Sequence, residues 1–116
     1  METLTKISAD TVAPFVLPNN GYICLQFHLH PSGEGVVLGM LPRLKHGRQE
    51  FASWKFYRND LTSTSYGEYC FDDLEGAAHK YQQRVRLLDP LEQARWEIEN
   101  DPIKRQQWAR LLGAEA

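Results

Sequence analysis

The fold is decided by residues 22–41, which read YICLQFHLHPSGEGVVLGML. Apolar side chains recur at every second position in the first part of this stretch, at Ile23, Leu25, Phe27 and Leu29. A period of two residues is typical of a β-strand with one buried face. The turn-forming residues Pro31–Gly35 follow, and Val36–Leu41 then predicts the returning strand of a hairpin.

Two further strands are predicted downstream of this hairpin. His46–Gly47 is a turn signal, and Glu50–Tyr57 alternates again. One side of this third strand carries Ala52, Trp54 and Phe56. Thr62–Ser65 is expected to be a connection, and Tyr66–Phe71 a short fourth strand. Together these segments predict a four-stranded antiparallel meander.

A long helix is predicted over Asp72–Leu88. Asp72 is the expected N-cap, and Glu75 stands three residues later, which is the spacing of a capping box. The apolar positions of this segment are Leu74, Ala78, Tyr81, Val85 and Leu88. Their spacing of three and four residues places them on one helical stripe, which we expect to cover the sheet.

Two short helices are predicted after this segment. Asp89–Pro90 and Asp101–Pro102 each combine a capping aspartate with a proline suited to the first helical turn. Trp96 and Trp108 follow them at the same spacing, and Gly113 is the expected end of the second helix. We attribute the similarity of the two segments to the use of the same capping residues, because a repeat of twelve residues is too short for a solenoid.

The N-terminal 20 residues are predicted to form an extended arm. Pro14 and Pro18 bracket an apolar run, and we expect Phe15 and Leu17 to pack on the body of the protein. An arm that binds a partner is the alternative. The predicted architecture is therefore one α+β domain in residues 21–116, with the sheet in residues 21–71 and the helices in residues 72–113.

Composition describes an ordinary globular chain. Of 116 residues, 42% are hydrophobic and 24% charged, and the net charge is −2, which excludes a disordered chain and a polycationic nucleic-acid binder. No apolar run approaches the length of a membrane helix, and Met1–Pro18 lacks the order of a signal peptide. The two cysteines, Cys24 and Cys70, suit free thiols in a reducing compartment. We therefore expect a cytoplasmic location.

The stretch His28-Leu29-His30-Pro31-Ser32-Gly33 resembles the metal-binding stretch of JAMM-type zinc hydrolases and RadC-type proteins. The resemblance implies a zinc ion shared by His28 and His30, which point the same way on a strand. The family's serine and aspartate are missing after Gly33, and the acids upstream, Glu2 and Asp10, lie in the arm. Zinc hydrolase chemistry is thus a third hypothesis, and two histidines near a hairpin end are the simpler interpretation.

Other catalytic patterns are absent from the sequence. It contains no phosphate-binding loop, no dinucleotide-binding glycine motif and no nucleophile elbow. Cys24 and His28 on one strand would lie about 13 Å apart, too far for a nucleophile and its base. The sequence predicts no catalytic residue, no metal and no cofactor, and we expect a protein that is not an enzyme.

Charge is unevenly distributed along the chain. Five basic residues face one acid, Glu50, in one short stretch. These residues are Arg43, Lys45, Arg48, Lys55 and Arg58. Cations interleaved with aromatic residues can bind nucleic acid through phosphate contacts and base stacking. Because Trp54 and Phe56 alternate like core residues, an ordinary hairpin is the competing interpretation.

The C-terminal tryptophans are a second candidate surface. Trp96 and Trp108 either pack in the core or, with Arg105, form the kind of tryptophan and arginine cluster that is typical of protein–protein hot spots. Such a cluster would suit a homodimer or docking on a larger complex.

Residues 22–88 as a whole resemble small phage and mobile-element proteins, among them anti-CRISPR-type inhibitors. The likeness is one of architecture: antiparallel strands, then Gly67–Glu75 leading into a helix with Ala78 and Tyr81. As a group these inhibitors bind and block a host complex, so the resemblance implies an inhibitor, although no site residue carries over.

The leading hypothesis is therefore a non-enzymatic binding protein, an inhibitor or adaptor that docks on a protein or ribonucleoprotein complex. A nucleic-acid-binding accessory protein that uses Arg43–Arg58 is the second hypothesis. The expected partner residues are Arg43, Lys45, Arg48, Lys55, Arg58, Trp96, Arg105 and Trp108. No contact with a membrane is expected.

Overall fold

The computed structural model describes residues 1–113 and, within them, all side chains except those of Tyr66, Lys104, Trp108, Leu111 and Leu112. The chain forms two compact units, Met1–Val85 and a second unit that starts at Arg86. The sequence analysis placed a boundary after residue 20, whereas these units divide between Val85 and Arg86. Each unit is described by itself.

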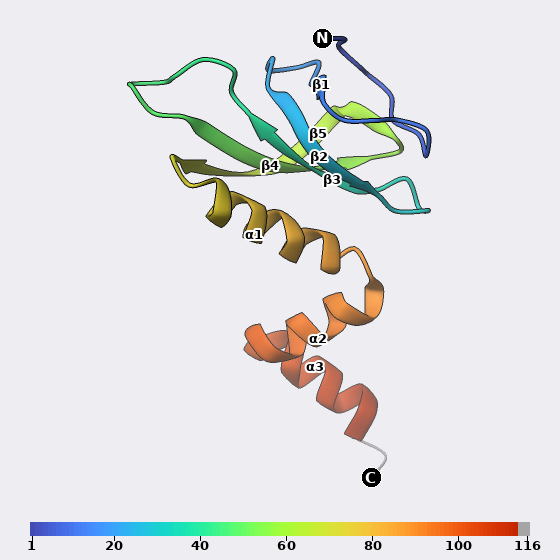
Figure 1. Cartoon of the computed structure of the whole chain (residues 1–116). Helices are drawn as coiled ribbons and strands as arrows, with labels where there is room; N and C mark the ends of the chain where they lie inside the picture. Colours follow the sequence, from blue (N-terminus) through green and yellow to red (C-terminus); the bar gives the residue numbers. More distant parts are fainter. Residues whose placement is uncertain (114–116) are drawn as a thin grey trace. The chain divides into compact units, whose positions relative to one another are not determined.

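The first unit contains a five-stranded antiparallel sheet in the order β1-β2-β3-β4-β5 (Figure 1). The strands are β1 (Phe15–Val16), β2 (Ile23–Leu29), β3 (Gly35–Met40), β4 (Glu50–Tyr57) and β5 (Asp60–Phe71). The α+β class and the antiparallel meander are confirmed. The strand count is five rather than four, because the short β1 adds to the edge beside β2.

The predicted start of the last strand is wrong. Thr62–Ser65, expected to be a connection, lies inside β5. The turn before β5 consists of Arg58 and Asn59, which both have positive φ angles, 58° and 57°. This is the backbone of a two-residue hairpin turn. Asparagine is common in such turns, but arginine is not, so the sequence contains no clear indication of a turn here. The prediction took the Thr/Ser-rich stretch Thr62–Ser65 for a connection, but threonine is also common in strands. The start of the last strand was therefore placed too late in the sequence.

The alternation predicted for β2 holds only in its second half. The pairing of β2 with β3 shifts register between Cys24 and Gln26, so Leu25 is an extra residue in the strand. A bulge of this kind reverses which side chains face the core. Tyr22 and Cys24 are therefore buried before the bulge, while Phe27 packs on the same core after it.

The N-terminal segment joins the two ends of the sheet. On one side, Val16 N–H donates to Glu2 O at 2.8 Å. On the other side, Leu61 N–H donates to Thr5 O at 2.9 Å and Ile7 N–H to Asn59 O at 3.1 Å. Residues 2–7 thus bridge β1 and the start of β5, and the sheet curls into a half-barrel (Figure 1).

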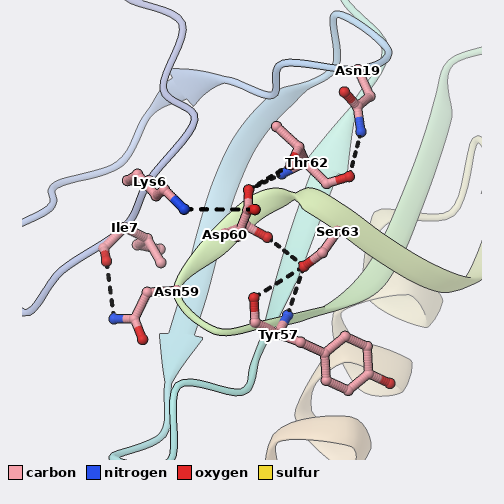
Figure 2. Close-up of polar contacts among 8 residues, drawn as sticks. All are labelled: Lys6, Ile7, Asn19, Tyr57, Asn59, Asp60, Thr62 and Ser63. Atoms are coloured by element: carbon pink, nitrogen blue, oxygen red, sulfur yellow. Dashed lines mark hydrogen bonds and ion pairs between the residues drawn. The ribbon is translucent and has the colours of Figure 1, made fainter.

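Polar side chains reinforce this junction. Figure 2 shows Lys6 reaching Asp60, with Nζ and Oδ2 3.6 Å apart, and Asn59 Nδ2 donating to Ile7 O at 3.1 Å. Asn19 Nδ2 donates to Thr62 O at 2.8 Å from the other side. The first 20 residues therefore belong to the packed structure of this unit.

One hydrophobic core fills the curled side of the sheet. It includes Ile7, Phe15, Leu17, Tyr22, Cys24, Val37, Leu41, Ala52, Trp54, Phe56 and Leu61. Burial of Phe15 and Leu17 is confirmed, as is the placement of Ala52, Trp54 and Phe56 on one buried side. Arm and sheet thus share a single core.

Helix α1 (Leu74–Arg86) covers the opposite face of the sheet (Figure 1). It buries Ala77 and Tyr81, and Arg84 Nη2 lies 2.7 Å from Glu68 Oε1 on β5. Leu74, predicted to be part of the buried stripe, is 50% exposed. The buried stripe is centred on Ala77 and Tyr81, while Ala78 and Val85 are half-buried.

Asp73, not Asp72, caps α1. Asp73 Oδ1 accepts the Gly76 N–H at 2.8 Å, the contact expected of an N-cap. Asp72 instead adopts a left-handed backbone with φ of 53°. The predicted capping box therefore began one residue too early, since two adjacent aspartates gave the same local signal.

The second unit contains α2 (Pro90–Asn100) and α3 (Pro102–Gly113). Both predicted caps are confirmed: Asp89 Oδ1 accepts the Leu91 N–H at 2.8 Å and Asp101 Oδ1 the Ile103 N–H at 3.0 Å. Proline begins each helix, as the sequence predicted.

Candidate functional site

The connection between β3 and β4 forms a tight hairpin over residues 41–50, which we call the braced hairpin. Its two-residue turn is His46–Gly47, with φ angles of 54° and 74°. Lys45 N–H donates to Arg48 O at 2.8 Å, and Arg48 N–H donates back to Lys45 O at 3.0 Å. The turn signal read from His46–Gly47 is confirmed, and the two residues that flank the turn are hydrogen-bonded to each other.

The base of the braced hairpin is fixed to the sheet and to the end of β5. Leu41 N–H donates to Glu50 O at 3.0 Å, and Gln49 Nε2 donates to Leu41 O. Gln49 N–H donates to Asp72 Oδ1 at 2.8 Å, while Asp72 N–H donates to Gln49 O at 2.8 Å. Asp72 thus fixes the base of the hairpin with two hydrogen bonds to Gln49: its carboxylate accepts one and its backbone N–H donates the other.

A buried carboxylate lies beneath the hairpin. Glu50 is only 3% exposed, and the Tyr22 hydroxyl donates to its Oε2. Lys45 Nζ lies 3.8 Å from the other oxygen, Oε1. Burial, followed by the hydrogen bond to Glu50, raises the pKa of Tyr22 well above its ordinary value, so the hydroxyl stays a donor. Both carboxylate oxygens therefore have partners, as a buried charge requires.

An aromatic row continues from Tyr22 across the curled face. The Tyr22 and Trp54 rings meet edge-on with centroids 4.9 Å apart, and the Trp54 and Tyr69 rings do the same at 5.9 Å. Trp54 has room because Gly39 and Gly67 stand against it, and a Cβ on Gly67 would lie 2.6 Å from Trp54 Nε1. The row holds the strands beneath the hairpin in a fixed register.

Two of the three hairpin cations face carboxylates. Lys45 lies beside Glu50, and Arg48 Nε is 3.5 Å from Asp72 Oδ2. The Arg48 guanidinium also lies over the Phe71 ring, 5.8 Å from its centroid. Arg43 is exposed. The carboxylates offset much of the positive charge that the sequence places here.

The braced hairpin exposes one large apolar side chain. Leu44 is 63% exposed and lies between Arg43 and Lys45. The sequence analysis missed Leu44, although a leucine between two cations beside a turn is a usable signal. Arginine is enriched among the residues that dominate interfaces, so an exposed apolar side chain beside Arg43 makes this hairpin a candidate contact surface.

The structure does not bring the five basic residues together. Arg43, Lys45 and Arg48 lie in the hairpin, whereas Arg58 lies in the turn at the other end of β4. A strand of 8 residues spans about 26 Å at ~3.3 Å per residue. Lys55 lies within β4, with Nζ 5.6 Å from the centroid of the Tyr57 ring.

The C-terminal candidates lie in the second unit. Trp96 is half-buried, and Arg105 donates from Nε to Ile98 O at 2.7 Å and from Nη2 to Glu99 O at 2.9 Å. Arg105 therefore satisfies carbonyl groups at the end of α2. Trp108 lies outside the described side chains, so the pairing expected with Trp96 is not placed.

The histidine pair is divided between strand and turn. His28 is exposed on β2, whereas His30 follows β2, and its Nδ1 accepts the Ser32 N–H at 3.1 Å. In the part of the chain that the structure describes, no three His, Cys, Asp or Glu side chains gather to hold a metal. Burial raises the pKa of the Cys24 thiol to about 12, which keeps it protonated and unreactive.

Comparison with known proteins gave no relatives: no family model, no curated protein and no solved structure matches this chain. Among the described residues, no helix combines the length and the apolar character needed to cross a membrane.

Proposed function

We propose that this chain is a non-enzymatic binding protein, an inhibitor or adaptor that docks on a protein or ribonucleoprotein complex through the braced hairpin. The observation that carries the proposal is a backbone-bonded turn that presents exposed Leu44 beside Arg43. This function is of the kind that the architectural resemblance to anti-CRISPR-type inhibitors implies.

Rigidity of the hairpin supports a docking role. Binding costs less entropy when a loop already holds its bound conformation. Here the turn is closed by two hydrogen bonds between Lys45 and Arg48, and its base is clamped by Asp72. Leu44 is therefore next to a fixed backbone position, since the following residue, Lys45, closes the turn.

Charge and burial favour a protein partner over nucleic acid. Phosphate binding depends on uncompensated cations, yet Lys45 and Arg48 face carboxylates. Base stacking needs exposed rings, yet Trp54 and Phe56 are 5% and 0% exposed. Nucleic-acid binding is retained as a second candidate because Arg43 and Arg48 are exposed on one turn.

A comparative pull-down tests the proposal. The tagged chain is incubated with lysate of its own cells, with and without nuclease, and the recovered proteins are quantified. Leu44→Asp is the test variant, and Val12→Asp is its matched control, because Val12 is likewise apolar and 78% exposed. We expect Leu44→Asp to lower recovery of the partner at least about tenfold, the scale of a hot spot, and Val12→Asp to retain it.

Each outcome of this experiment decides between the candidates. Recovery that resists nuclease and depends on Leu44 supports protein docking. Recovery that is lost with nuclease but is unaffected by Leu44→Asp moves the function to nucleic acid and Arg43. Equal recovery with Leu44→Asp and wild type overturns the role of the braced hairpin.

A further inference from the structure

Strand β5 leaves part of its outer edge without a neighbour in the sheet. It is the last strand of the sheet order, and among the described residues those that hydrogen-bond to its outer edge, residues 5–7 and Asn19, lie at its start. Asp72 N–H donates to Gln49 O, so this position faces β4. Because neighbouring residues of a strand point their backbone groups in opposite directions, Phe71 and Tyr69 point theirs away from β4.

The same segment exposes two aromatic rings. Tyr69 is 53% and Phe71 38% exposed, and both lie on the curled face, since they pair with Ala52 and Glu50 of β4. Gly67 stands two residues before Tyr69, and the Trp54 ring and the Tyr69 hydroxyl occupy the space that a side chain at Gly67 would fill. An unpaired edge with exposed aromatic residues is a template for a further strand.

We propose that this edge pairs with the same edge of a second copy of the chain, in an antiparallel two-fold dimer centred on Tyr69. The two-fold then places Tyr69 opposite Tyr69 of the second copy, and their outward backbone groups form the hydrogen bonds. Phe71 falls opposite Gly67 of the second copy, where the Trp54 and Tyr69 side chains cover the glycine and offer an aromatic surface to the ring. Glu68 falls opposite Cys70, so no like charges meet.

Charge selects this register from its alternatives. The two-fold axis must pass through a residue that is flanked on both sides by residues of the free segment Gly67–Phe71, so that pairs form on either side of the axis. Glu68, Tyr69 and Cys70 meet this condition. Centring on Glu68 places two glutamates directly opposite each other. Centring on Cys70 places Glu68 opposite Asp72. Like charges that face each other across two strands are destabilising, so only the register on Tyr69 avoids them.

The aromatic residues add a favourable contribution in the same register. Cross-strand aromatic pairs stabilise antiparallel strands, and the Tyr69 ring already packs edge-on against Trp54 at 5.9 Å. The pairing would extend this row, from Tyr22 through Trp54 and Tyr69, into the second copy. It also places the exposed rings of Tyr69 and Phe71 in an interface. The dimer surface does not include Leu44, although its Phe71 ring lies beside Arg48 of the braced hairpin, so dimer formation and docking are tested by different variants.

Sedimentation velocity of the full chain tests the dimer. We expect the mass to rise from 13.4 kDa toward twice that value between about 1 µM and about 1 mM protein. Tyr69→Glu places like charges opposite each other and removes the aromatic pair, so it should weaken dimerisation at least about tenfold. Val12→Glu, an exposed apolar residue outside β5, should dimerise like wild type.

Cross-linking tests the register and covers the case in which Tyr69→Glu fails to fold. In a Cys70→Ser background, Tyr69→Cys should form a disulfide-linked dimer under mild oxidation by diamide, because residue 69 faces its own copy. Wild-type Cys70 faces Glu68 and should cross-link at least about tenfold more slowly. A wild-type chain that stays monomeric to about 1 mM overturns the proposal. So does a dimer that persists in folded Tyr69→Glu, or equal cross-linking at positions 69 and 70.

Discussion

Removal of one hydroxyl, in Tyr22→Phe, tests whether the buried carboxylate anchors the braced hairpin. The Tyr22 hydroxyl donates to Oε2 of Glu50, which is 3% exposed. Phenylalanine fills the same space but leaves that oxygen buried with one partner fewer. Hydrogen bonds to charged groups contribute about 1.5–3 kcal/mol, so the free energy of unfolding should fall by that amount.

The assay follows unfolding of the first unit alone. Urea denaturation is monitored by the NMR signal of the Trp54 indole proton, because Trp54 lies between Tyr22 and Tyr69. Tyr69→Phe is the matched control. This variant also removes one hydroxyl, but from the exposed end of the aromatic row, where the Tyr69 hydroxyl accepts a long hydrogen bond of 3.4 Å from Trp54 Nε1. It should lower the free energy of unfolding by less than about 0.5 kcal/mol.

A double-mutant cycle isolates the interaction. Tyr22→Phe should cost less in a Glu50→Gln background than in wild type, because the charged acceptor is then absent. The reasoning fails if Tyr22→Phe costs no more than Tyr69→Phe. It also fails if the cost of Tyr22→Phe is the same with glutamate and with glutamine at position 50.

Three further perturbations follow from the structure. Gly35→Ala should destabilise by at least about 2 kcal/mol in urea denaturation, because a Cβ would lie 2.1 Å from the Phe56 ring, while Gly113→Ala should be neutral. Asp73→Ala should cost about 1 kcal/mol through loss of the α1 cap, measured by helical circular dichroism, and Asp73→Asn should not. The Cys24 thiol, with a pKa of about 12, should react with iodoacetamide only on unfolding, whereas equal rates for Cys24 and Cys70 would contradict its burial. Because the folded pKa of Cys24 is raised above its ordinary value of 9.0, its stabilising contribution is complete below about pH 9 and declines as pH rises to about 12.

Local signals in the sequence were sufficient for much of the fold. The buried side of β4 followed from alternation, and the starts of α2 and α3 followed from Asp89 and Asp101 beside proline. These features depend on residues within one turn or one strand of each other. These elements can therefore be predicted from a short window of sequence.

The errors share a different cause. The bulge at Leu25 changes which side chains of β2 face the core. The turn at Arg58–Asn59 places arginine at positive φ, a conformation that is uncommon for this residue and that the sequence did not predict. Both are stabilised by pairing with other strands. Closure of the sheet by residues 2–7 likewise depends on partners that are far along the chain, at Val16 and Leu61. Tertiary hydrogen bonds overrode the local preference in each case.

The candidate site illustrates the same limit at a single residue. From the sequence, Asp72 was interpreted as a helix cap, a role that Asp73 fills. In the structure Asp72 instead binds Gln49 through backbone and side chain and faces Arg48, 24 positions earlier in the chain. The charge pattern therefore predicted an exposed cluster of cations but not the acid that compensates it.

The two adjacent aspartates have separate structural roles in one short segment. Asp73 begins α1, while its neighbour Asp72 holds the base of the braced hairpin. The left-handed backbone at Asp72, with φ of 53°, turns the chain so that both aspartates reach their separate partners. Positive φ is uncommon outside glycine, although aspartate adopts it more readily than most residues, and the contacts to Gln49 and Arg48 stabilise it here. The base of the braced hairpin and the start of α1 thus both depend on one turn of the chain at Asp72 and Asp73.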